Sequence, residues 1–136
     1  MTRYHLFISH SWNYTDKYEG LLKLLDSDKS FSYSDYSVPK NSPIHNAKDD
    51  KALYNAIKSQ MQYAGVVLIL AGVYATYSNW INKEITIAKT EFKVSKPIIA
   101  VEYWGSERTS RVVKDSADEI VKWQAFSIIS AIRRLS

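Results

Sequence analysis

The stretch GVVLILA, residues 65–71, is the strongest indication of the fold in this sequence. It is a near-continuous run of β-branched and aliphatic residues, which is typical of a central parallel strand covered on both faces. The wider apolar run from Ala64 to Ala75 is broken by Gly65 and Gly72. It is shorter than the roughly 20 apolar residues that a membrane-spanning helix needs. We therefore expect residues 65–71 to form the central strand of a parallel sheet.

Strand and helix patterns alternate on both sides of this run. Short apolar or alternating stretches predict further strands at residues 4–9, 30–35, 97–102 and 120–123. Apolar residues at helical spacing predict helices over 14–26, around Ile57 and Met61, after residue 78, and around Ile128 and Ile132. The order β-α-β-α-β-α-β-(α)-β-α predicts an α/β fold, in which a parallel sheet lies between two helical layers.

Composition restricts the class of protein. The 136 residues suit a single domain, residues 1–136, and the 46% hydrophobic and 24% charged content suits a globular one. Cysteine is absent, which excludes disulfides, a thiolate nucleophile and a cysteine zinc site. The first residues lack a signal-peptide pattern, so we expect a cytoplasmic protein that is not membrane-bound. The net charge of +4 comes from scattered basic residues, which favours a solvated surface over a nucleic-acid site.

Ligands of parallel α/β sheets bind beyond the carboxyl ends of the strands. Three segments are expected there: residues 9–12 after the first strand, 36–50 after the second, and 72–80 after the third. The segment 36–50 contains two prolines and no periodic pattern, and loops of that length in small domains are usually functional or irregular.

Several chemistries are excluded by missing motifs. A dinucleotide fingerprint needs glycines directly after the first strand, but the first glycine is Gly20, inside the first predicted helix. A Walker-type loop and a Gly-x-Ser-x-Gly elbow are also absent. The histidines His5, His10 and His45 are not spaced as a helical metal pair, so no metal is expected.

The segment SNWINKE, residues 78–84, holds the candidate catalytic group. Trp80 and Glu84 are four residues apart and share one face of the predicted helix. The predicted core stripe of that helix consists of Ile81, Ile85, Ala88 and Phe92. Glu84 lies about 60° from its centre, at the border between core and surface. Three interpretations remain open: a working carboxylate beside an indole, a first-turn glutamate that favours the helix N-terminus, or a partner for a lysine.

Six segments together resemble a known family. They are FISHSW, FSYSDYSVP, VVLILAGVY, SNWINKEITIA, KPIIAVEYWG and VKWQAFSIISAIR, in this order from Tyr4 to about Leu135. They resemble the TIR-like family typified by the ThsB proteins of bacterial Thoeris anti-phage defence. The most specific motif is Ser-x-Trp-x-x-x-Glu at residues 78–84, which carries the catalytic glutamate in TIR domains that cleave NAD.

The resemblance implies a flavodoxin-like TIR fold with five parallel strands and Glu84 as the catalytic residue. The residues that it implies at the substrate are Phe7, Ser9, His10, Ser11, Asp35, Tyr36, Tyr74, Ser78 and Trp80. Some of these have a simpler interpretation. Ser9 and His10 at a strand end would satisfy backbone groups, and Asp35 would form a turn. The Tyr36 and Tyr74 rings would either stack on the substrate or only cover the edge of the sheet.

The implied reaction is cleavage of the nicotinamide–ribose bond of NAD, which is the substrate; no cofactor is implied. The implied product is a cyclic ADP-ribose-type signal for a separate effector, made after a phage-derived trigger. TIR domains also self-associate, and we expect contacts near residues 36–50 and 78–80. The alternative is a non-catalytic TIR-like assembly module. A nucleotide- or nucleic-acid-binding domain of flavodoxin-like fold is a third hypothesis, which a steep salt dependence of affinity would favour.

Overall fold

The structure is a computed structural model that describes residues 3–9, 15–36, 50–71, 79–102 and 115–136. Its elements are β1 (Arg3–Ser9), α1 (Thr15–Asp26), β2 (Ser32–Asp35), α2 (Asp50–Met61), β3 (Val66–Ala71), α4 (Asn79–Thr90), β4 (Ile98–Glu102), β5 (Glu119–Lys122) and α6 (Ala125–Leu135). This order confirms the predicted alternation of strands and helices. Within those ranges, no helix has the length and apolar character needed to cross a membrane.

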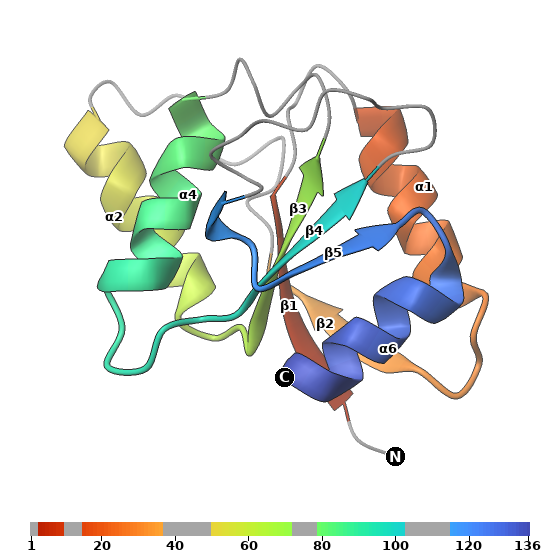
Figure 1. Ribbon diagram of the computed structural model, residues 1–136. Helices are drawn as coiled ribbons and strands as arrows, with labels where there is room; N and C mark the ends of the chain where they lie inside the picture. The colour runs from red at the N-terminus through yellow and green to blue at the C-terminus, as the bar shows by residue number, and fades with distance from the viewer. Residues whose placement is uncertain (1–2, 10–14, 37–49, 72–78, 103–114) are drawn as a thin grey trace.

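The five strands form one sheet in the order β2-β1-β3-β4-β5, and every neighbouring pair is parallel (Figure 1). β3 is the central strand, as the apolar run predicted. Its register aligns Leu6 of β1 with Val66, and Val67 with Ile98 of β4. The chain therefore has the predicted flavodoxin-like α/β arrangement, with helices on both faces of a parallel sheet.

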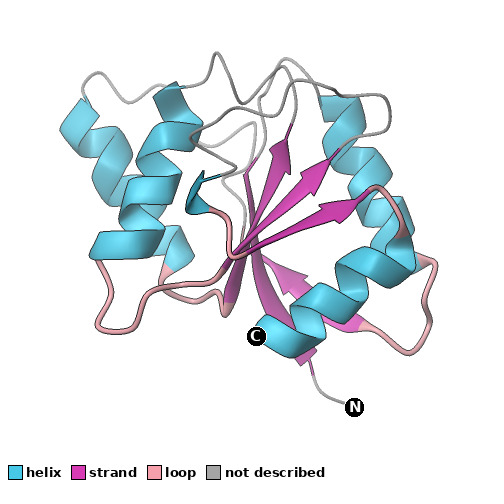
Figure 2. Ribbon diagram, in the orientation of Figure 1, coloured by secondary structure: helices cyan, strands magenta, loops and turns pink. Residues whose placement is uncertain are grey.

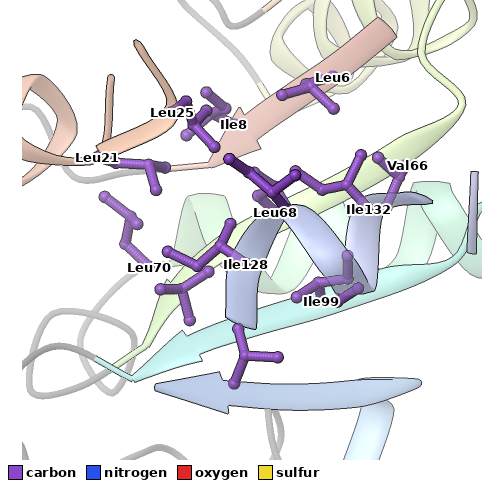
Figure 3. Packing of buried hydrophobic residues seen from close by; sticks show 14 of the residues in the cluster. Leu6, Ile8, Leu21, Leu25, Val66, Leu68, Leu70, Ile99, Ile128 and Ile132 are labelled. Carbon is purple, nitrogen blue, oxygen red and sulfur yellow. The ribbon is translucent and has the colours of Figure 1, made fainter. Parts of the chain in front are cut away.

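Two separate hydrophobic cores hold the helices on the sheet. One face carries α1 and α6, and the other carries α2 and α4 (Figure 2). Alternate strand residues point to opposite faces, so β3 sends Leu68 into the α1/α6 core and Ile69 into the α2/α4 core. Figure 3 shows the α1/α6 core, where Ile128 and Ile132 of α6 pack over the strands. The burial of β3 on both sides explains its lack of polar residues.

The second strand begins later than its sequence pattern predicted. The prediction placed it over residues 30–35, but β2 starts at Ser32. The carboxylate of Asp28 accepts hydrogen bonds from the backbone N–H and the hydroxyl of Ser30, at 2.8 and 2.6 Å. Such an aspartate turn reverses the chain locally, so Phe31 packs into the core before strand pairing begins.

Gly20 lets α1 approach the end of β5 closely. A Cβ atom at this position would lie 3.3 Å from Cζ2 of Trp123, whose ring packs against the α1/α6 core. An indole is rigid, so a larger side chain at position 20 has to displace the helix or the ring. The glycine therefore serves helix packing, which agrees with the absence of a dinucleotide fingerprint around it.

We predict that Gly20→Leu lowers the free energy of unfolding by about 1–3 kcal/mol through overpacking against Trp123. Urea denaturation monitored by circular dichroism measures the change. The matched control is Lys23→Leu, which places the same side chain at an exposed position of the same helix. An unchanged stability for Gly20→Leu would contradict the close packing of α1 on Trp123.

Candidate functional site

Glu84 is buried on the face of α4 that packs against the sheet. Its side chain is 1% exposed, and its Oε2 atom has almost no contact with solvent. Of the side chains that the structure describes, it is the one charged group in the buried set. Glutamates are almost never fully buried in proteins unless they are paired, since desolvation of a charge is costly. Its position therefore needs an explanation beyond packing.

The predicted border position of Glu84 was wrong, and Ile87 is the reason. The buried residues around Glu84 on α4 include Ile85, Ile87 and Ala88. At about 100° per residue, Ile85 lies about 100° to one side of Glu84 and Ile87 about 60° to the other. Glu84 thus lies inside the buried arc. The predicted core stripe omitted Ile87, which shifted its centre away from the carboxylate.

The residue at which α4 begins argues against one of the simpler interpretations of Glu84. α4 begins at Asn79, and its first turn has no acidic residue. A rise of about 1.5 Å per residue puts Glu84 about 7.5 Å along the axis, in the second turn. The favourable effect of the helix dipole on an anion falls off within the first turn. A role of Glu84 as a first-turn charge is therefore not supported.

α4 brings Glu84 close to the expected ligand edge of the sheet. The helix follows β3 in the chain, so its N-terminal half lies toward the carboxyl ends of the strands (Figure 1). The same face of the sheet carries Phe7 of β1, which is fully buried in the core together with Ile85. Ser9 is the last residue of β1, and its Cα pairs with Ile69 of β3. Phe7 therefore packs in the core on this face of the sheet, and the substrate contact that the resemblance implies for it stays a prediction.

Asp35 and Tyr36 do not join Glu84 in this structure. Asp35 pairs in register with Leu6, which belongs to the α1/α6 core on the opposite face from Glu84. The Tyr36 ring stacks on Tyr63 with 5.7 Å between centroids, and its hydroxyl lies 3.2 Å from Nδ1 of His5. His5 lies four residues before the end of β1, so the Tyr36 ring points back along the strand. This geometry favours the alternative interpretation of Tyr36, in which its ring only covers the edge of the sheet.

The remaining predicted site residues cannot be placed. His10, Ser11, Tyr74 and Ser78 lie outside the described residues, as do residues 37–49 of the loop predicted over 36–50. Trp80 belongs to the first turn of α4, and its side chain lies outside the described part. These assignments stay predictions. Within the described ranges, no cluster of three or more histidine or acidic side chains has the arrangement of a metal site.

A polar contact between α2 and α4, which the sequence did not reveal, supports the helix that carries Glu84. The Tyr54 hydroxyl donates a hydrogen bond to Oε2 of Glu91, just after α4, and Nζ of Lys58 lies 3.3 Å from Glu91 Oε1. Tyr54 and Lys58 lie four residues apart on α2, but Glu91 is distant in sequence. The hydrogen bond from Tyr54, followed by the effect of Lys58, lowers the pKa of Glu91.

The family of the chain follows from comparison with known protein families. Residues 7–108 match the family described as Thoeris protein ThsB, TIR-like domain. The chain belongs to this TIR-like family. The match runs from β1 to beyond β4 and includes the whole segment 78–84, which ends at Glu84. A search of curated proteins gave no match. The parallel five-stranded sheet agrees with a TIR-like domain of a defence protein family.

We predict that Tyr54→Phe weakens the domain more at neutral pH than at acid pH. The pKa of Glu91 is lower in the folded state than in the unfolded chain, so the native state binds fewer protons in this range. The contribution of Glu91 to stability is fully present above the pKa that Glu91 has in the unfolded chain. It is lost as the pH falls through the pKa of Glu91 in the folded state. Tyr54→Phe removes the largest cause of that shift.

The measurement is urea unfolding of wild type and Tyr54→Phe between pH 3 and pH 7. Tyr33→Phe is the matched control, because it removes a tyrosine hydroxyl that donates to Asp26 on the other face of the sheet. The loss of stability in Tyr54→Phe should shrink toward acid pH. A loss of the same size at every pH would show that Glu91 does not mediate it.

Proposed function

We propose that this TIR-like domain cleaves the nicotinamide–ribose bond of NAD, with Glu84 as the catalytic carboxylate. The observation that supports this proposal most strongly is the burial of Glu84 on the α4 face near the ligand edge of the sheet. The family match supports it independently, since residues 78–84 carry the Ser-x-Trp-x-x-x-Glu motif of NAD-cleaving TIR domains. NAD is the substrate, and the reaction as proposed uses no cofactor.

The chemistry needs one carboxylate at the ribose. The nicotinamide ring of NAD is positively charged, so the bond between its nitrogen and ribose C1′ breaks with both electrons moving to the nitrogen. Neutral nicotinamide leaves, and the ribose develops oxocarbenium character, as in glycoside hydrolysis. A preorganised anion near that positive charge stabilises the transition state, and its effect is larger where water is excluded. Ile85 and Ile87 provide apolar surroundings for Glu84.

The second half of the reaction decides the product. Attack by water on ribose C1′ gives ADP-ribose, and the proton of the water is lost to solvent or to a nearby base. Attack by another group of the same molecule gives a cyclic ADP-ribose isomer, with loss of one proton from the attacking group. We propose the cyclic product, because the buried apolar side chains around Glu84, such as Ile85 and Ile87, limit the access of water to the reacting carbon. The cyclic product then acts as a signal for a partner effector in the cytoplasm. The domain makes this product after a phage-derived trigger.

We predict that Glu84→Gln lowers nicotinamide release from NAD about 10²-fold or more, because a neutral amide cannot stabilise the developing positive charge. The assay incubates purified protein with NAD and lysate from phage-infected cells, and mass spectrometry identifies the products. Glu91→Gln is the matched control: it makes the same chemical change one residue after α4 and should keep activity. Thermal unfolding of both variants verifies that they are folded.

Two results would contradict the proposal. Activity of Glu84→Gln equal to that of wild type would remove Glu84 from the chemistry. Absence of NAD turnover by wild type in the presence of the trigger would favour the alternative, a non-catalytic assembly module. The ratio of cyclic product to ADP-ribose in the same spectra tests the proposed cyclisation separately from bond cleavage.

A further inference from the structure

The part of the sheet formed by β2 and the first half of β1 has a polar face. Parallel sheets normally carry helices on both faces, and their strands are then apolar on both sides. The α2/α4 core, however, contains Phe7 of β1 and no side chain of β2. On the same face as Phe7, the register places Arg3 beside Ser32 and His5 beside Ser34. Polar residues therefore occupy positions at which a packed helix would require apolar ones.

Two serine hydroxyls hold the Arg3 guanidinium across β2. Its Nε atom donates to Ser34 Oγ at 2.6 Å, and its Nη1 atom donates to Ser32 Oγ at 2.8 Å. A guanidinium has five N–H groups, and among the described residues these two bonds leave three of them for another acceptor. Arg3 is exposed, and each serine keeps its hydroxyl hydrogen, because its oxygen accepts from the arginine. The three side chains together form a fixed cluster of hydrogen-bond donors.

The charge and shape of this donor cluster suit a phosphate group. A guanidinium held in one orientation binds phosphate oxygens through two parallel hydrogen bonds. The acidic residue of β2, Asp35, does not neutralise Arg3 from this face, because it pairs in register with Leu6 of the α1/α6 core. A phosphate monoester has three acceptor oxygens, so it can accept from the guanidinium and from both hydroxyls at the same time.

Aromatic rings continue this face next to the donor cluster. Ser34, which accepts from Nε of Arg3, is in register with His5, and the His5 ring lies 5.6 Å from that of Tyr36 between centroids. Tyr36 in turn stacks on Tyr63, whose side chain is 61% exposed. The donors and the rings therefore begin at the same level of the sheet. The Tyr63 ring offers surface for the stacking of a further planar group.

We propose that this face of β1 and β2 is a binding site for a nucleoside monophosphate. The phosphate lies on Arg3, Ser32 and Ser34, and the base stacks on Tyr63. In such a ligand a single ribose joins the phosphate to the base, as the short separation of the donor cluster from the rings requires. Inorganic phosphate and a free nucleoside would each use only one part of the site.

The position of this site separates it from the proposed active site. Arg3 is the first residue of β1 and Ser9 is the last, which puts about 20 Å of strand between them at 3.3 Å per residue. Glu84 lies toward the carboxyl ends of the strands, at the other end of the sheet from Arg3. The site therefore holds its ligand whether or not Glu84 cleaves NAD.

The test measures the binding of AMP, inorganic phosphate and adenosine to the whole chain by isothermal titration calorimetry, at about 0.15 M salt. Arg3→Gln removes the charge and the planar fork but keeps an amide that can donate to a serine. Arg133→Gln is the matched control, because Arg133 also donates to a serine hydroxyl, that of Ser30, and lies over the Phe31 ring. Tyr63→Ser removes the exposed ring. Thermal unfolding verifies that each variant is folded.

The proposal predicts that AMP binds at least about 10-fold more tightly than inorganic phosphate or adenosine, because stacking adds to the phosphate contacts. Arg3→Gln should weaken AMP binding about 10-fold or more, since hydrogen bonds to charged groups are lost, and Arg133→Gln should leave it unchanged. Tyr63→Ser should weaken the binding of AMP but not that of phosphate. In proton NMR spectra, AMP should shift the ring signal of His5, which His5→Gln assigns.

Several results overturn the proposal. They are absence of AMP binding at millimolar concentration, equal effects of the two arginine variants, and an AMP affinity that Tyr63→Ser leaves unchanged. If Arg3→Gln does not fold, Arg3→Lys replaces it: this variant keeps the charge without the planar fork, and an unchanged AMP affinity contradicts the proposal. A short oligonucleotide that binds more tightly than AMP, with a steep salt dependence, would indicate a nucleic-acid surface instead.

Discussion

The burial of β3 on both faces determines where the helices of this domain lie. Its side chains from Val66 to Leu70 are removed from solvent, so each face has to be covered by helices, and the crossovers between parallel strands supply them. The same constraint places α4, which comes after β3 along the chain, on the face of the sheet that it shares with α2. The helix that carries Glu84 is therefore positioned by the most apolar strand of the chain.

At the buried position of Glu84, packing favours an apolar side chain, and electrostatics disfavours a charged one. An aliphatic side chain at position 84 would fill the buried face of α4 between Ile85 and Ile87 without the cost of desolvating a carboxylate. Natural proteins keep such costly groups mainly where they have a function, and the cost is compensated by the surrounding structure. The α2/α4 core and the contact of Tyr54 and Lys58 with Glu91 hold α4 in place. The stability of the helix and the proposed reactivity of the carboxylate thus arise from different residues.

Much of the fold could be predicted from local patterns, because the run at residues 65–71 and the helical spacing of apolar residues reflect burial directly. The boundary at Ser32 was missed, because a hydrogen bond from Ser30 to Asp28 delays strand pairing. The predicted border position of Glu84 differs from its observed burial for a simpler reason: the predicted stripe does not include Ile87, which is buried. The Tyr36 contacts with His5 and Tyr63 join residues far apart in sequence, and periodicity carries no information on such contacts.

In the proposed reaction, the Glu84 carboxylate faces the ribose of bound NAD. Carbon-13 NMR of the protein with labelled glutamate carboxyl groups tests it directly, with signals assigned from Glu84→Gln and Glu91→Gln. Addition of an NAD analogue that cannot be cleaved should shift the Glu84 signal and leave the Glu91 signal in place. An analogue that binds while the Glu84 signal stays unchanged would contradict the claim.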